Sequence, residues 1–171
     1  TFRQNKRFYC DQRLGYIELL KTMNTRYHLT IQFSHGTSEE NAIRILSTFI
    51  RNLNKRVYKD RYRSGKNFIK GFAVKESTKS KLTCHFHLLL MDNDYYPNKE
   101  LLEKWIEKQK GYFIKCDNKN YITSHLLQSY QNLGDDNLEH YLTKNFESLS
   151  NEEAAMSIAP FSENGVEFGS F

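Results

Sequence analysis

Cysteine, proline and long hydrophobic runs are scarce in this sequence. Only three cysteines occur among 171 residues, and none forms a Cys-x-x-Cys pair, so neither a disulfide framework nor a cysteine zinc site is expected. Two prolines and eight glycines argue against a linker-rich or repetitive architecture. The most apolar stretch, residues 86–91, is interrupted by His87 and is in any case too short to cross a bilayer. A cytoplasmic protein without a membrane anchor is therefore expected.

The residues that are present indicate one globular domain with a basic middle. Hydrophobic residues make up 39% and aromatic residues 14%, which is enough apolar material for a core of ordinary size. Eleven basic and two acidic residues lie between Arg51 and Lys81, whereas one lysine and eight acidic residues follow from Leu133 onward. A basic stretch of this kind suggests a polyanionic partner, although a solvated basic surface has the same composition.

Hydrophobic periodicity predicts strands and helices in mixed order. Strands are expected at 27–33, 68–74 and 84–91, the last two forming a hairpin, and a second hairpin at 112–116 and 121–123. Helices are expected at 14–23, from the capping box at 37–40, after Pro97, at 124–131 and at 137–147. The predicted fold is α+β, a central antiparallel sheet flanked by helices over residues 1–148. Residues 149–171 are expected to be a tail or the start of a truncated segment.

Two histidines lie two residues apart in the strand predicted at 84–91. Side chains at positions i and i+2 of a strand leave the same face, about 6–7 Å apart, so His85 and His87 can grip one metal ion. Two ordinary half-exposed histidines would show the same pattern. Glu76 lies across the expected hairpin, where its carboxylate would complete a two-histidine, one-carboxylate site.

Rival ligands and a rival chemistry remain open at this point. Asp92 and Asp94 lie farther along the strand or beyond its end, and His28, His125 and His140 are further candidates. Zinc hydrolases also use His-x-His, but the aspartate expected after it is absent, since position 89 is leucine.

Tyr141 and Lys144 form a second constellation in the helix predicted at 137–147. Residues three apart on a helix share a face, so the lysine can stabilise a phenolate, which otherwise forms only near pH 10. Attack of a tyrosine on a phosphodiester leaves a phosphotyrosine bond, from which the strand can later be rejoined. The chain has 11 tyrosines, and most tyrosines in proteins serve packing.

These features occur in an order and spacing that resemble the HUH endonucleases, above all replication-initiator (Rep) proteins of rolling-circle plasmids and single-stranded DNA viruses or phages. Their first motif is an apolar strand, which HLTIQF at 28–33 resembles. Their second is His-hydrophobic-His, here HFHLLL at 85–90, and their third is Tyr-x-x-Lys, here YLTK at 141–144. The resemblance covers roughly residues 27–146.

The resemblance implies an HUH, Rep-like fold and a DNA nickase. His85, His87 and Glu76 would hold Mg²⁺ or Mn²⁺, and Tyr141 would attack single-stranded or hairpin DNA at a replication origin. The products would be a 5′-phosphotyrosine and a free 3′-OH for a polymerase, while Lys144 would orient the site or balance its charge. Tyr121 and Tyr130 are not one helical turn from Tyr141, so one nucleophile is expected. No phosphate loop of the GxxxxGKS/T type is present, so either a host helicase in the bacterial cytoplasm or nucleoid would open the duplex, or the chain is a fragment of a longer protein.

The basic middle then gains an expected role in binding DNA. Tyrosines alternate there with cations in a predicted loop, a pattern suited to stacking unpaired bases and neutralising phosphates. The expected DNA-binding residues are Tyr58, Lys59, Arg61, Tyr62, Arg63 and Lys66.

Three other functions fit parts of the same pattern. A single-tyrosine transposase or a relaxase of a mobile element would use the same histidines and tyrosine. A DNA-binding regulator would keep the fold without the chemistry. A zinc hydrolase would use His85 and His87 and would not need Tyr141.

Overall fold

The structure of this chain is a computed structural model that describes residues 13–76, 83–130, 142–144, 146, 149 and 151–169. Residues 13–22 are helical. The elements that follow are β1 (Thr25–Phe33), α2 (Glu39–Tyr58), α3 (Asp60–Arg63), β2 (Gly71–Glu76), β3 (His85–Met91), α4 (Lys99–Asp117), β4 (Ile122–Ser129), α6 (Asn151–Ala155), β5 (Ile158–Ser162) and β6 (Gly165–Val166).

The strands form one six-stranded sheet in the order β4-β1-β3-β2-β5-β6. Every neighbouring pair is antiparallel. The first four strands follow a split β-α-β pattern, because α2 links β1 to β2 across β3, and α4 links β3 to β4 across β1. The predicted α+β class, with an antiparallel sheet flanked by helices, is confirmed.

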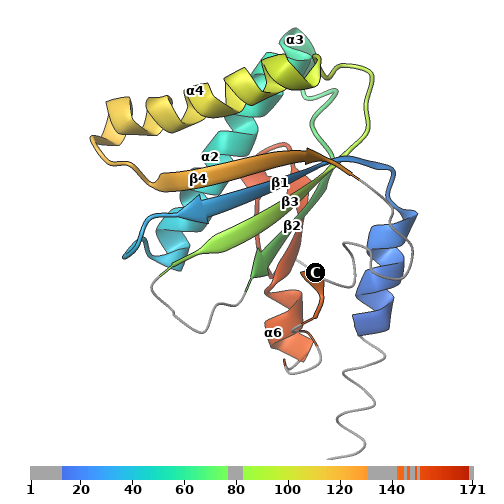
Figure 1. The fold of residues 1–171 in the computed structure, drawn as a ribbon. Coiled ribbons are helices and arrows are strands. Elements are labelled where there is room, and N and C mark those ends of the chain that lie inside the picture. The colour runs from blue at the N-terminus through green and yellow to red at the C-terminus, as the bar shows by residue number, and fades with distance from the viewer. Residues whose placement is uncertain are drawn as a thin grey trace, which may run out of the picture.

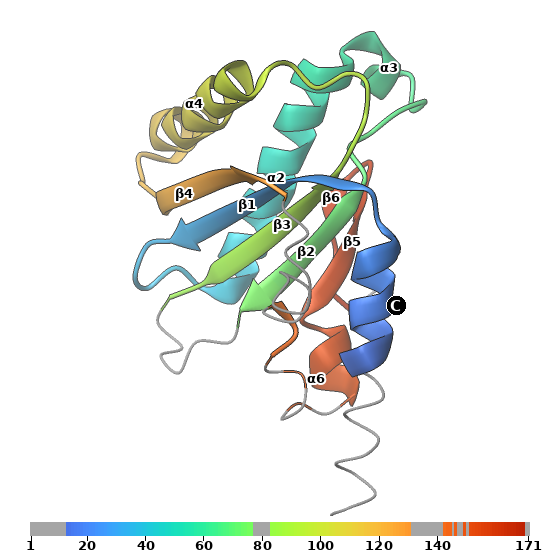
Figure 2. The same ribbon diagram turned by 45° about the vertical axis from the view of Figure 1, so that its right-hand side comes forward.

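The two faces of the sheet are covered by different parts of the chain. On one face, alternate residues of β1 and β3 such as Leu29, Ile31 and Phe86 pack against the buried sides of α2 and α4. On the other face, Val74 and Leu89 form a second cluster with Leu20 of the 13–22 helix. Figures 1 and 2 show α2 passing behind the sheet and the 13–22 helix lying beside β2 and β5.

Polar side chains at both helix starts fix α2 and α4. The side chains of Ser38 and Asn98 accept hydrogen bonds from the backbone of Asn41 and Leu101 and so act as N-caps. The strand predicted at 112–116 is wrong, because Phe113 continues the buried stripe of Leu102, Ile106 and Gln109 along α4. Neither of these helices, nor any other in the described part of the chain, is long and apolar enough to span a membrane.

Two further expectations are corrected by the sheet itself. The helix predicted at 124–131 is instead strand β4, which pairs with β1 along nearly its whole length. The expected tail at 149–171 contributes α6, β5 and β6, and β5 adds a strand beside β2 through Ile158, Ala159 and Pro160. The strands β5 and β6 are too short to show a clear period, and the burial of β4 does not alternate strictly, so only long-range pairing reveals these strands.

Candidate metal centre

Strand register brings Glu76, His85 and His87 together on the second face of the sheet. In the β2–β3 ladder Glu76 lies opposite His85, and Val74 lies opposite His87. Because side chains alternate along a strand, both histidines and the carboxylate leave the same face. The hairpin predicted from the sequence therefore brings the three predicted ligands together on one face of the sheet.

The ligand atoms converge on one point. Glu76 Oε2 lies 2.9 Å from His87 Nε2 and 3.2 Å from His85 Nδ1. One ligand atom from each of the three residues lies within 4.8 Å of the others, so the group could hold a metal ion. The His87 side chain is 6% exposed and that of His85 28%, so the centre is closed behind and open toward solvent. Two imidazoles and a carboxylate suit a divalent cation that keeps positions for other oxygen ligands.

The protonation states of the cluster favour metal binding near neutral pH. Burial lowers the pKa of His87 and outweighs the opposing influence of Glu76. Burial alone would raise the pKa of Glu76, but the hydrogen bond from His87 and the nearby His85 and Lys144 hold it below its ordinary value. A neutral imidazole and an ionised carboxylate are the forms that ligate metal.

His28 of β1 contacts the ring nitrogen of His87 that faces away from Glu76. His28 Nε2 lies 2.9 Å from His87 Nδ1, and Thr30 Oγ1 lies 3.3 Å from both nitrogens. In the absence of a metal ion the contact with Glu76 places the proton of His87 on Nε2. Binding of a metal ion at Nε2 would move the proton to Nδ1, from which it can be donated to His28 Nε2. A ligand histidine held in this way has a fixed ring and tautomer.

The stability of the metal-free protein should fall with acid because of His28. Burial, followed by repulsion from His87 and His85, lowers its pKa from 6.5 to about 4. The unfolded chain therefore takes up a proton at higher pH than the folded chain, so stability is intact above pH 6.5 and is lost as the pH falls toward 4. Urea unfolding in EDTA should show a loss of about 2 kcal/mol between pH 7 and pH 5.

The variant His28→Gln provides the control for this pH dependence, because glutamine keeps a hydrogen-bonding side chain and does not titrate. Its loss of stability between pH 7 and pH 5 should be clearly smaller. An equal loss in both proteins would show that His28 is not the group responsible.

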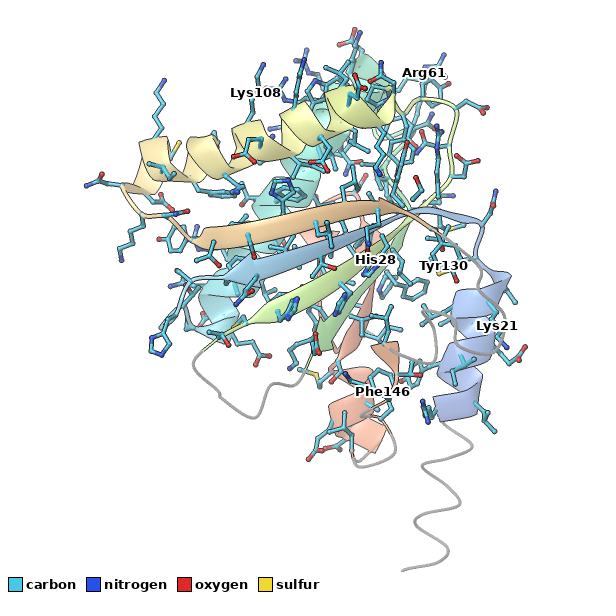
Figure 3. The ribbon with its side chains drawn as sticks, viewed as in Figure 1. Lys21, His28, Arg61, Lys108, Tyr130 and Phe146 are labelled. Carbon is cyan, nitrogen blue, oxygen red and sulfur yellow. The ribbon has the colours of Figure 1, made fainter. Side chains whose placement is uncertain are left out.

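The segment that follows Tyr141 lies against the metal centre. Lys144 Nζ is 3.8 Å from Glu76 Oε1, and Thr143 is buried. Leu142 and Phe146, the latter labelled in Figure 3, join the apolar cluster beside the centre. The Phe146 ring meets the Tyr16 ring edge-on. Tyr141 itself, like His140, lies outside the described residues.

The other candidate ligands lie elsewhere. Asp92 pairs with Arg26 at the far end of β3, and Asp94 lies two residues beyond it in the chain. His125 faces α4, where its Nε2 lies 3.1 Å from Glu103. Of the extra histidines considered from the sequence, only His28 contacts the cluster within the described ranges. Its link to His87 spans 59 residues, and no local pattern could have shown it.

Among the expected DNA-binding residues, the cations are exposed, whereas the two tyrosines contact other parts of the protein. Lys59, Arg61, Arg63 and Lys66 are exposed at the end of α2 and around α3, which replaces the predicted loop. Tyr58 belongs to the core, so it is not placed to stack on a base. The Tyr62 hydroxyl donates to the Glu163 carbonyl at 2.6 Å.

Polar and exposed residues continue from the metal centre toward the sheet edge. Gln32 of β1 and Ser124, Leu126 and Gln128 of β4 are exposed on the same face as His85, and Leu126 is 53% exposed. This part of the sheet face is therefore open to solvent.

Comparison with known proteins leaves the chain without a family assignment. No family model matches it, and no significant match is found among curated proteins or among solved structures.

Proposed function

We propose that this protein is a metal-dependent nickase of single-stranded DNA that uses Tyr141 as its nucleophile. The observation that carries the proposal is the convergence of Glu76, His85 and His87 at an open point of the sheet. Lys144, three residues after Tyr141, reaches the same carboxylate. This contact of the residue three positions after Tyr141 with a proposed metal ligand supports the resemblance to HUH initiators.

The proposed reaction is a transesterification between Tyr141 and a DNA phosphodiester. The Tyr141 oxygen would attack phosphorus as its phenolic proton passes to solvent or a base. A phosphotyrosine bond to the 5′ side would form as the bond to the 3′ oxygen breaks, and that oxygen would leave with a proton as a 3′-OH. Lys144 would favour the phenolate and the negative charge that builds on the phosphate. Because no external nucleophile is consumed, reversal would rejoin the strand.

His85, His87 and Glu76 would hold the divalent cation, for which Mg²⁺ or Mn²⁺ is proposed. When bound, such an ion supplies positive charge that polarises a phosphate oxygen. The role of His28 would be to keep His87 Nε2 directed toward that ion.

Cleavage of circular single-stranded DNA tests the proposal. With Mn²⁺, the protein should convert part of the circular DNA into linear molecules that carry protein at the 5′ end, because each nick leaves a covalent tyrosine link. EDTA should prevent this. Linear products with free 5′ phosphates would instead indicate hydrolysis, and intact circles across DNA of varied sequence would favour a binding protein without chemistry.

A zinc hydrolase is the second candidate function, because zinc binds to the same set of donor groups. Two histidines and a glutamate also form catalytic zinc sites, and both imidazoles here have a carboxylate beside them. Stoichiometric zinc in the purified protein, with an activity that survives Tyr141→Phe, would support this function over the nickase.

A further inference from the structure

Tyr95 separates two hollows at the end of the sheet opposite the metal centre. One measures about 620 Å³ and the other about 410 Å³, and Tyr58, Asp94 and Tyr95 line both. The smaller hollow reaches Met91, the last residue of β3, which lies four residues, or about 13 Å along a strand, from His87. The hollows are therefore distinct from the metal centre. Figure 3 shows Arg61 at the α3 end of the molecule and His28 on the sheet.

The walls of the hollows are predominantly cationic. Two of their three acidic residues have partners outside the walls, because Asp60 pairs with Arg63 and Asp92 pairs with Arg26. The basic wall residues are all exposed; they are Arg56, Lys59, Arg61, Lys66 and Lys70. Such a surface attracts a polyanion.

The ring between the hollows is held in place and partly exposed. Tyr95 is 39% exposed, and its backbone N–H donates to Asn93 Oδ1 at 2.8 Å. The Tyr58 ring lies 5.1 Å away, and the Arg61 guanidinium lies 4.8 Å from the ring centroid and bonds the Tyr95 hydroxyl. Because the Arg61 side chain is exposed, an incoming base can stack on the guanidinium or take its place. An anchored ring flanked by cations is how proteins bind unpaired bases and their phosphates.

We propose that the two hollows form one groove for single-stranded DNA, with a base stacked at Tyr95 and phosphates on the cations around it. Unpaired bases are required, because only they expose a face to an aromatic ring. The groove would hold the strand away from the phosphate that is cut. The proposal rests on the nickase function only in naming this strand as the substrate.

Equilibrium binding of a fluorescent oligo(dT) in EDTA tests the stacking. Tyr95→Ala should weaken binding by about 5- to 100-fold, since one base–aromatic stack is lost. Tyr95→Phe should bind nearly as tightly as the unchanged protein, because the ring remains. Duplex DNA of the same length should bind Tyr95→Ala and the unchanged protein alike.

The salt dependence of the same binding tests the cations. The double variant Lys66→Ala/Lys70→Ala should reduce the slope of log K against log salt by about 1.4, since each phosphate contact to a single strand contributes about 0.7. Lys115→Ala/Lys119→Ala removes the same charge from exposed positions at the other end of α4 and should leave the slope unchanged.

The binding experiments distinguish failure of the proposed groove from failure of the proposed nickase function. Unchanged oligo(dT) affinity in Tyr95→Ala, equal losses on duplex DNA, or equal slopes in the two double variants would overturn the groove, whether or not the protein nicks DNA. Loss of oligo(dT) affinity in Tyr95→Ala, in a protein that never nicks DNA, would support the groove and count only against the nickase.

Discussion

Replacement of Tyr141 by phenylalanine should abolish the covalent protein–DNA adduct and slow strand cleavage by at least about a thousandfold. The substitution removes the one oxygen proposed to attack phosphorus. The metal ligands are untouched, so the affinity for Mn²⁺ should stay the same. Adduct formation on a denaturing gel and titration with Mn²⁺ measure the two effects separately.

Tyr130→Phe is the matched control for this substitution. Tyr130 lies just after β4 and is half-buried, and it is not proposed to react, so the adduct should form at the normal rate. Loss of the adduct in Tyr130→Phe but not in Tyr141→Phe would mean that a different tyrosine carries the chemistry.

Substitution of His87 by alanine should weaken Mn²⁺ binding by more than about 100-fold and remove metal-dependent cleavage. Loss of a residue that merely supports a ligand typically costs 10- to 100-fold in affinity, and His87 is proposed to ligate directly. It is also the most buried member of the cluster, held between Glu76 and His28. Calorimetric titration of the metal-free protein with Mn²⁺ gives the affinity.

His125→Ala separates this effect from general damage to the sheet. His125 is also a strand histidine beside a carboxylate, but it is half-buried and faces α4. Its substitution should leave the Mn²⁺ affinity within about twofold. Equal losses in both variants, at equal stability, would remove the metal from the Glu76 cluster.

Those parts of the candidate site that depend on local geometry were predictable from the sequence. His85 and His87 share a face because strand side chains alternate, and Glu76 joins them because β2 pairs antiparallel with β3, the next strand in the chain. The predicted antiparallel sheet with flanking helices is also confirmed. The placement of the three ligands therefore follows from two strands that are consecutive in the chain.

The parts that were missed depend on pairing between distant segments. His28 reaches His87 only through the β1–β3 register, and β5 joins β2 from more than 80 residues away. The position of Tyr95 beside Tyr58 and the hollows depends on the contact between the end of α2 and the loop after β3. The predicted strand at 112–116 failed for a different reason: aromatic and β-branched residues there favour a strand, yet the buried stripe of α4 continues to Phe113.

Mapping the site of DNA attachment tests the central claim most directly. The protein would be incubated with Mn²⁺ and single-stranded oligonucleotides, trimmed with nuclease and protease, and sequenced by mass spectrometry. The peptide that spans residues 120–144 contains Tyr121, Tyr130 and Tyr141, so fragmentation distinguishes the three. We expect the 5′-nucleotide on Tyr141, in the metal-containing sample alone. A nucleotide on another residue, or one that forms equally well in EDTA, would contradict a metal-dependent nickase built on Glu76, His85, His87 and Tyr141.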